Sequence, residues 1–255
     1  MEINSVSAVY FSPGGSTKVV AKAVASALGE CTERDFTSRA ASLSFGEGEA
    51  AVFAAPVFGG RIPGVFADFL GAVSGNGAPA VVLAVYGNRA YEDALLELAD
   101  AVRARGFRVV AAGAFIARHS MVTELAAGRP DAADKAAMAD FGAKVKAKLA
   151  ADDFSEPAIP GNRPYKKYGG VPLHPGANRQ RCVKCGKCAR ECPVGAIPAD
   201  APYKTENDKC ITCMHCVFTC PNYARGLSPV LLAATRTKLK RSAQTDGPRR
   251  FLYNP

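Results

Sequence analysis

The first part of the chain alternates between continuous apolar runs and segments with helical periodicity. The strongest apolar runs cover residues 6–11, 50–55, 80–87 and 107–117, and a weaker run covers residues 31–37. Helical periodicity covers residues 16–28, 64–73, 90–106 and 131–150. Continuous apolar runs are typical of parallel strands that are buried on both faces. The pattern therefore predicts strands and helices in regular alternation over residues 1–150.

This alternation, with short connections, predicts a doubly wound α/β fold with a five-stranded parallel sheet in the order 2-1-3-4-5. Only the connection after the second strand is too short for a full helix. In open sheets of this kind, ligands bind at the carboxyl ends of the strands. We therefore expect functional residues in the loops that follow the first, third and fourth strands.

The first of these loops is the stretch SPGGST, residues 12–17, which leads from a predicted strand into a predicted helix. Its spacing fits neither the Walker phosphate loop nor the Gly-x-Gly-x-x-Gly dinucleotide fingerprint. It combines hydroxyl side chains with glycines that free backbone N–H groups at a helix N-terminus, where anions bind. The loop predicts a phosphate site, with a plain strand-to-helix turn as the alternative.

The other two loops carry aromatic side chains. Residues 56–63, PVFGGRIP, include Phe58, and residues 86–94, YGNRAYEDA, include Tyr86 and Tyr91. One phosphate loop beside two aromatic loops suits a phosphorylated planar ring, anchored at one end and held between the other two loops. His119 follows the fifth strand near the same edge, and we weigh contact with the ligand against a structural role.

The first loop resembles the phosphate loop of the flavodoxins, which runs hydroxyl-x-Thr-Gly-x-Thr. It matches at the first hydroxyl, the glycine and the last threonine, and it departs at Gly14, where a hydroxyl residue is usual. The resemblance implies that the ligand is FMN. Because the chain has no Trp, an aromatic of these loops must cover the ring. The implied FMN-binding residues are Ser12, Gly14, Gly15, Ser16, Thr17, Pro56, Val57, Phe58, Gly59, Gly60, Tyr86, Gly87, Asn88, Arg89 and Tyr91.

The second part of the chain holds two copies of the pattern Cys-x2-Cys-x2-Cys-x3-Cys-Pro, the second 28 residues after the first. Three closely spaced thiolates can converge on one cubane cluster, and the fourth cysteine points to the neighbouring cluster. This spacing assigns Cys182, Cys185, Cys188 and Cys220 to one 4Fe–4S cluster and Cys210, Cys213, Cys216 and Cys192 to the other. Two zinc knuckles are the alternative, because Cys-x2-Cys pairs also bind zinc.

Residues 179–226 resemble the bacterial two-cluster ferredoxins, and the order of the whole chain resembles the flavodoxin–ferredoxin fusion proteins of anaerobes. The resemblance implies one FMN, two 4Fe–4S clusters and electron transfer. The expected division is a flavodoxin-like FMN-binding domain at 1–150, a Pro- and Gly-rich strap at 151–178, a ferredoxin domain at 179–226 and a basic tail at 227–255. The strap is long enough to return the clusters to the flavin edge, with an ordinary flexible linker as the alternative.

Charge is distributed unevenly between the two parts. Residues 1–150 carry equal numbers of acidic and basic residues, so the formal net charge of +9 lies in residues 151–255. The basic tail is typical of a solvated segment, or it docks an acidic partner. No nucleic-acid recognition motif accompanies the charge. The chain start does not read as a signal peptide and no apolar stretch is long enough to span a membrane, so we expect a cytoplasmic protein.

Two classes of function remain open. In the first, the protein is an electron carrier of anaerobic metabolism that relays electrons between FMN and the clusters, to or from a redox partner protein. In the second, it is a flavin-dependent reductase of a small molecule, of the quinone or nitro type, fed by the clusters. The sequence offers no acid–base or nucleophile constellation, which favours the carrier.

Overall fold

The computed structural model describes residues 3–242 and 253–254, and its main sheet has the order β10-β7-β6-β4-β1-β2. The five parallel strands are β1 (Ser5–Tyr10), β2 (Cys31–Asp35), β4 (Glu49–Pro56), β6 (Pro79–Tyr86) and β7 (Arg108–Ile116). Their order confirms the predicted flavodoxin-like fold. The sequence did not predict β10 (Tyr253–Asn254), which pairs antiparallel with the edge strand β7.

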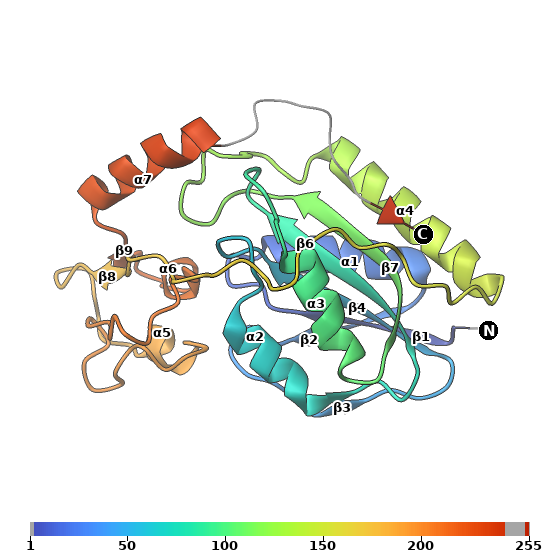
Figure 1. Ribbon diagram of the computed structural model, residues 1–255. Helices are drawn as coiled ribbons and strands as arrows, with labels where there is room; N and C mark the ends of the chain where they lie inside the picture. The colour runs from blue at the N-terminus through green and yellow to red at the C-terminus, as the bar shows by residue number, and fades with distance from the viewer. Residues whose placement is uncertain (1–2, 243–252, 255) are drawn as a thin grey trace.

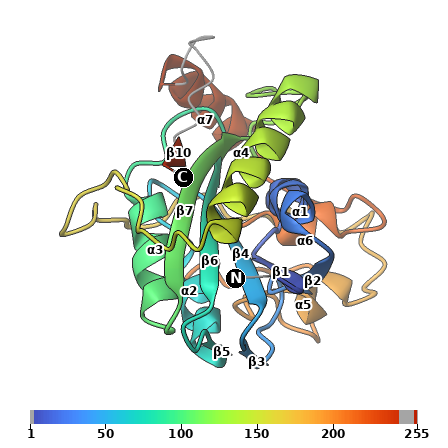
Figure 2. The same cartoon turned by 90° about the vertical axis from the view of Figure 1, so that its right-hand side faces the viewer.

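Helices cover both faces of this sheet. They are α1 (Ser16–Leu28), α2 (Gly64–Phe69), α3 (Ala94–Arg103) and α4 (Ala132–Ala150). Figure 2 shows α1 and α4 on one face and α2 and α3 on the other. The predicted helix at 64–73 is shorter than expected, because the chain continues through a 3-10 turn, η1 (Leu70–Ala72), into β5 (Val73–Ser74). Strand β5 pairs with β3 (Leu43–Ser44), which occupies the connection without a helix.

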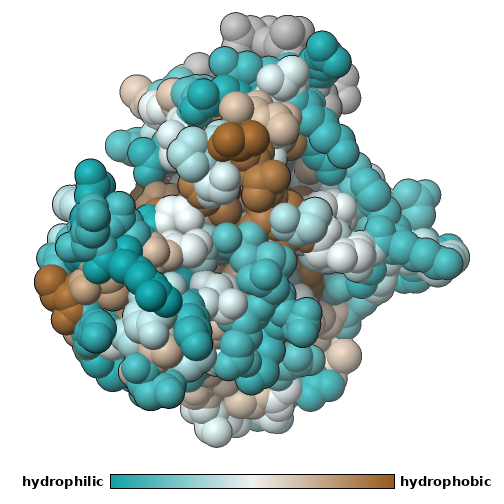
Figure 3. All heavy atoms as spheres, turned by 90° about the vertical axis from the view of Figure 1, so that its left-hand side faces the viewer, coloured by the Kyte–Doolittle hydropathy of each residue, from teal (hydrophilic) through white to brown (hydrophobic). Residues whose placement is uncertain are grey.

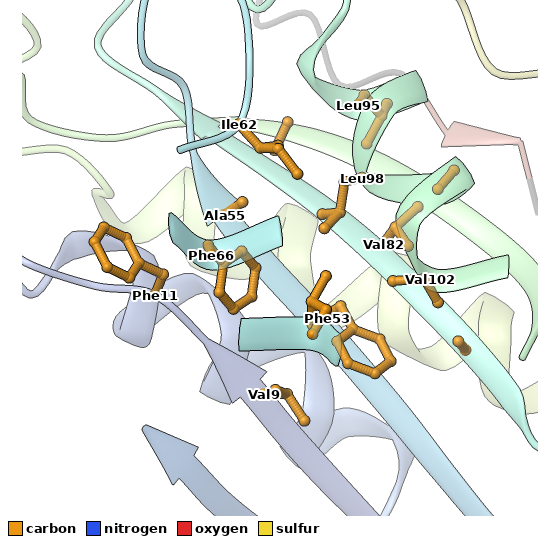
Figure 4. Close-up of a cluster of buried hydrophobic side chains, with 14 of the residues drawn as sticks. Val9, Phe11, Phe53, Ala55, Ile62, Phe66, Val82, Leu95, Leu98 and Val102 are labelled. Carbon is orange, nitrogen blue, oxygen red and sulfur yellow. The ribbon is translucent and has the colours of Figure 1, made fainter. Parts of the chain in front are cut away.

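The core consists of two apolar layers, one on each face of the sheet. On the α2–α3 face, Phe53 of β4 lies beneath Phe66 of α2 and Leu98 of α3 (Figure 4), and all three side chains are fully buried. Burial of each such side chain contributes about 1.5–3 kcal/mol. The strands are rich in alanine and valine, whose small side chains let the helices pack closely on the sheet.

The cluster module lies at one end of the molecule (Figure 1). It contains β8 (Gly176–Ala177), α5 (Lys187–Arg190), α6 (His215–Phe218) and β9 (Arg225–Gly226), and β8 pairs antiparallel with β9. The two sequence copies have the same backbone. Lys184 and Thr212, which are 28 residues apart, have φ of 54° and 55°, and Gly186 and Met214, also 28 apart, have φ of 72° and 67°.

The last described helix, α7 (Pro229–Ser242), lies in the segment expected to be a basic tail. Pro229 suits the first turn of a helix, and the following Leu, Ala, Lys and Arg residues are good helix formers. The rest of the expected tail, apart from residues 253–254, is outside the described residues. None of the described helices combines the length and apolarity needed to cross a bilayer.

The segment between the two parts runs from the end of α4 back across the first domain to the cluster module (Figure 1). It is held along α3. The Asp93 carboxylate, which is 2% exposed, accepts hydrogen bonds from the backbone N–H of Asn162 at 2.8 Å and of Lys166 at 2.7 Å. Arg163 forms an ion pair with Asp100 at 2.6 Å. These contacts place Tyr168 beside the carboxyl ends of the strands.

Candidate cofactor sites

A pocket opens at the carboxyl ends of the parallel strands, and we call it the loop pocket. It contains about 1030 Å³ of space free of atoms, including its open mouth. Most of the residues predicted to bind FMN line it, namely Gly14, Ser16, Thr17, Pro56, Val57, Phe58, Gly59, Gly60, Tyr86, Gly87 and Arg89. The structure therefore brings the three predicted loops to one cavity.

Four of the predicted residues are not part of the pocket wall. They are Ser12, Gly15, Asn88 and Tyr91. Ser12 is buried, and its Oγ accepts a hydrogen bond from the Lys18 backbone N–H at 2.8 Å. Tyr91 packs edge-on against Tyr86, with ring centroids 5.6 Å apart. Ser12 thus holds the first loop to α1, and Tyr91 packs against Tyr86 of the third loop.

The first loop has the geometry of an anion site. Gly15 has a left-handed backbone with φ of 84°, and α1 begins directly after it at Ser16. Ser12 ties the loop to the helix and also donates its backbone N–H to Thr37 Oγ1 at 2.9 Å. The Lys18 N–H is taken by Ser12 Oγ, and the pocket-lining residues Ser16 and Thr17, at the start of α1, form one wall of the pocket. A helix N-terminus with adjacent hydroxyls favours a phosphate.

The second loop needs glycine because neighbouring side chains lie against it. A Cβ on Gly59, whose φ is 61°, would lie 2.4 Å from the Tyr168 ring. A bidentate pair of Arg61 with Glu97, at 2.7 and 2.6 Å, fixes the far end of the loop, and Glu97 also accepts from the Ile62 N–H at 3.0 Å. These hydrogen bonds hold the loop in place, and Tyr168 of the strap adds an aromatic side chain to the pocket wall that the sequence pattern did not predict.

A fourth loop, which follows β7, forms another wall of the pocket, and the sequence analysis singled out only His119 from it. His119 Nδ1 accepts hydrogen bonds from the backbone N–H groups of Met121 at 3.2 Å and Val122 at 3.1 Å. Burial, and secondarily the charge of Arg89, lowers the pKa of His119. The imidazole is therefore neutral near pH 7 and carries its proton on Nε2.

The eight cysteines of the repeated pattern surround two further pockets. The outer cysteine pocket is lined by Cys182, Cys185, Cys188 and Cys220, and the inner cysteine pocket by Cys192, Cys210, Cys213 and Cys216. These are the two sets of four that the spacing predicts. The backbone N–H of Ala196 donates to Cys192 Sγ and that of Ala224 to Cys220 Sγ, both at 3.3 Å. The two fourth ligands thus have equivalent surroundings.

The buried cysteine side chains suit a metal centre, because a thiolate ligand needs positive charge beside it when it is buried. Burial raises the pKa of Cys213 to about 12 and that of Cys216 to about 11. Thiolates at such buried positions need a compensating cation or metal centre. An iron–sulfur cluster supplies this compensation, so the donor set fits the predicted cofactor.

A buried cation lies next to the outer cysteine pocket. Arg225 is 5% exposed and donates hydrogen bonds to the carbonyl oxygens of Pro202 at 2.7 Å and Pro175 at 2.8 Å. Its Nη1 also lies 4.0 Å from Cys188 Sγ. Its charge lowers the pKa of both Cys188 and Cys216, against the dominant effect of burial, so it acts on a cysteine of each pocket. Nothing in the repeated cysteine pattern marks Arg225 as part of a site.

The inner half of the cluster module packs on the loop pocket. Ile211 lines both the loop pocket and the inner cysteine pocket. His215 Nδ1 lies 3.0 Å from the carbonyl oxygen of Pro13, and the Phe218 ring lies against Gly14, where a Cβ would be 3.2 Å from it. The cavity with the predicted phosphate loop and the cavity with four cysteines are therefore neighbours.

Residues 174–221 match the family model of a 4Fe–4S dicluster domain. The putative electron transport protein YccM of Escherichia coli (strain K12) is 43% identical over 44 residues, which are 17% of this chain and 12% of that protein. The pyruvate synthase subunit PorD of Methanocaldococcus jannaschii is 37% identical over 65 residues, which are 24% of this chain and 76% of that protein. Through this part, the chain belongs to the 4Fe–4S dicluster domain family. The prediction of two 4Fe–4S clusters is confirmed.

Two solved flavodoxins align with the other part of the chain. A flavodoxin from the domain Archaea is 15% identical with a TM-score of 0.41, and it covers 57% of this chain and 99% of its own. The flavodoxin of Streptococcus pneumoniae TIGR4 is 19% identical with a TM-score of 0.39, and it covers 56% of this chain and 99% of its own. The assignment of the fold rests on the strand order given above.

Proposed function

We propose that this chain is an electron-transfer protein in which FMN, bound in the loop pocket, exchanges electrons with two 4Fe–4S clusters. A redox partner protein delivers or receives the electrons. One observation carries the proposal: Ile211 lines both the loop pocket and the inner cysteine pocket, so a flavin and a cluster in these cavities would be neighbours. FMN accepts one or two electrons and each cluster accepts one, which is the chemistry these groups supply.

In this proposal the first loop holds the FMN phosphate. Ser16 and Thr17 offer hydroxyls to it, and the N-terminus of α1 offers N–H groups. Phe58, Tyr86 and Tyr168 are the aromatic residues of the pocket wall, and they cover the ring in place of the missing Trp. His119 keeps its Nδ1 occupied with backbone N–H groups, so only its protonated Nε2 can serve a ligand.

The two sets of four cysteines hold one cluster each, and the set at the inner cysteine pocket faces the flavin. Cys213, at 8% exposed, belongs to the same apolar core as the residues of β4 and β6, whereas Cys185 at the outer cysteine pocket is exposed. This difference in burial supports a spatial order in which the inner cluster lies next to the loop pocket and the outer cluster lies on the side of the solvent. The Pro- and Gly-rich segment 151–178 serves as the strap that keeps this order.

The alternative function is a flavin-dependent reductase of a quinone or nitro compound. Neutral His119 favours it, because an Nε2–H in the pocket wall can donate to a small acceptor. Steady-state turnover of the purified protein with such acceptors separates the two functions, since a carrier reduces them only slowly.

The FMN site is tested by replacing the two pocket hydroxyls together. We expect Ser16→Ala with Thr17→Val to lose most FMN and to retain about eight iron per chain, because the phosphate and the clusters bind to different parts of the chain. The matched control is Ser7→Ala with Thr32→Val, a neighbouring pair on β1 and β2 that is not part of the pocket wall. FMN and iron are measured after anaerobic purification.

Parental FMN content in the pocket variant would refute the phosphate site. Zinc in place of iron in every preparation would refute the cluster assignment in favour of zinc knuckles. A cytoplasmic location and a role in anaerobic metabolism remain predictions from the sequence.

A further inference from the structure

The two halves of the cluster module are related by the 28-residue repeat, but they face different surroundings. The inner half contacts the loop pocket through four residues: Ile211, Thr212, His215 and Phe218. The residues at the equivalent positions of the outer half are Val183, Lys184, Lys187 and Arg190. The outer half has the same left-handed backbone positions, and Val183, Lys184 and Arg190 are exposed there.

This outer surface is apolar at its centre and basic around it. Val183 is 66% exposed, and Lys184 and Cys185 are exposed as well. Lys184, Lys187 and Arg225 line the outer cysteine pocket, and its wall contains no acidic residue. Glu191 forms an ion pair with Lys187, at 3.9 Å from its Nζ. Figure 3 faces this end of the molecule, and hydrophilic residues cover most of its surface there.

The inner surface lacks these cations. Positions 184 and 187 correspond to Thr212, whose Oγ1 donates to the Val171 carbonyl at 3.1 Å, and to His215, which contacts Pro13. The inner half thus meets its own domain through apolar contacts and hydrogen bonds, without a Lys or Arg side chain at these positions. The outer half keeps an exposed apolar centre and adds positive charge, as expected of a surface that must attract a separate molecule from solution.

We infer that the outer surface, formed by Val183, Lys184, Lys187 and Arg190, docks an acidic redox protein, in the way that the inner surface docks on the loop pocket. The inference rests on the proposed function, because it assigns the outer cluster to exchange with the external partner. One electron passes between this cluster and the partner's redox centre per encounter, and no bond or proton moves. The partner carries carboxylates around its own redox centre and a small apolar contact for Val183.

The test uses one redox protein with two opposite surface charges: native cytochrome c, which is basic, and succinylated cytochrome c, which is acidic. The reduced holoprotein transfers one electron to the haem iron, which goes from ferric to ferrous. We expect the rate with the acidic form to fall as salt is added and the rate with the basic form to rise. Binding of the oxidised acidic form, measured by titration at low ionic strength, should be salt-sensitive in the same direction.

The location is tested with Lys184→Glu plus Lys187→Glu. We expect about tenfold slower transfer to succinylated cytochrome c, weaker binding of it and faster transfer to native cytochrome c. The matched control is Lys135→Glu plus Lys146→Glu on α4, which makes the same charge change far along the sequence and should leave rates and affinity near parental values. Iron content shows whether both clusters are retained. If the glutamates impair loading, Lys184→Gln plus Lys187→Gln should give a smaller change of the same sign.

Equal effects of the two charge reversals, or no effect of the Lys184 and Lys187 pair in loaded protein, would overturn the docking surface. Failure of the flavin relay has a different signature. The variant Ser16→Ala with Thr17→Val, without FMN, should still reduce the acidic cytochrome from its clusters with the same dependence on Lys184 and Lys187. Loss of flavin–cluster exchange therefore leaves the docking result intact, and the reverse also holds.

Discussion

Arg225 breaks the symmetry of the cluster module at a buried position. Its equivalent 28 residues earlier is Ile197, and both side chains are 5% exposed. A buried guanidinium costs free energy unless it is hydrogen-bonded, and the two Nη atoms of Arg225 donate to the carbonyls of Pro175 and Pro202, whereas its Nε has no hydrogen-bond partner among the described residues. The Nη atoms also contact the Lys204 carbonyl and the Thr205 hydroxyl, and Nη1 lies 4.0 Å from Cys188 Sγ. One positive charge held beside thiolate ligands stabilises the reduced form of a cluster, which carries the additional negative charge.

We expect Arg225→Met to lower the reduction potential of the outer cluster by on the order of 50 mV. For a one-electron couple, this corresponds to somewhat less than a tenfold change in the equilibrium constant for reduction. Arg225→Lys keeps the charge and should keep most of the potential. Arg179→Met removes a cation that stacks on Tyr203 at 4.4 Å, and it serves as the control without a shift. Potentials are measured by anaerobic titration with electron paramagnetic resonance, at equal iron content. A parental potential in loaded Arg225→Met protein would rule out this role.

At the scale of the elements, the sheet and its helices follow from local pattern. Buried parallel strands give continuous apolar runs such as residues 80–87. The helix expected over residues 131–150 is α4, and a reciprocal cap between Asp131 and Asp134 begins it. Elements that depend on distant contacts were missed. Strand β10 forms only because the edge of β7 accepts it. Helix α7 has a weak amphipathic pattern, so its charges suggested a solvated tail.

The same distinction holds within the candidate sites. The cysteine sets and the three strand-end loops are local in sequence, and they were predicted. The contribution of Tyr168 to the loop pocket was not, because it depends on where the strap lies. Arg225 was indistinguishable from other cations of a basic segment, since only the fold shows that its side chain is buried.

Gly59 of the loop after β4 allows a direct test of the contact with the strap. We expect Gly59→Ala to weaken FMN binding at least about tenfold, because its Cβ would lie 2.4 Å from the Tyr168 ring and displace it. Gly77→Ala is a matched control: its φ of 84° is also positive, but nothing lies within 4 Å of an added Cβ. Both variants carry a backbone cost of about 1 kcal/mol. FMN affinity is measured by fluorescence titration, and equal affinity in the two variants would contradict the role of Tyr168.

At the scale of the whole molecule, we expect the strap to hold the two folded parts together as the proposed electron-transfer unit. It is anchored near its middle by the Asp93 carboxylate, which accepts from the N–H groups of Asn162 and Lys166. The hydrogen bond from Lys166 is the main cause that lowers the pKa of Asp93, partly offset by burial. The ordinary pKa of an Asp carboxyl is near 4. Because the pKa of Asp93 is lowered, the anchor contributes its full stability at pH values above 4, and this stability is lost only as the pH falls further. The anchor should therefore be constant across pH 5–8.

We expect Asp93→Asn to release the strap without unfolding either part. The amide presents an N–H group where two backbone N–H groups need acceptors, and loss of a buried charge-assisted hydrogen bond costs about 1.5–3 kcal/mol. In Asp93→Asn, deuterium uptake by a peptide spanning residues 159–168 should increase at least about tenfold at pH 7. In the parent protein, the protection of this peptide should stay unchanged from pH 5 to 8 after correction for intrinsic exchange. Asp140→Asn, at an exposed ion pair with Lys144 on α4, is the control.

Electron transfer gives a second readout of the Asp93→Asn variant. In this variant, a low-potential donor that enters through the clusters should reduce FMN more slowly in stopped flow. A mobile strap with a parental rate of flavin reduction would mean that packing of Ile211, His215 and Phe218 alone holds the cluster module on the loop pocket.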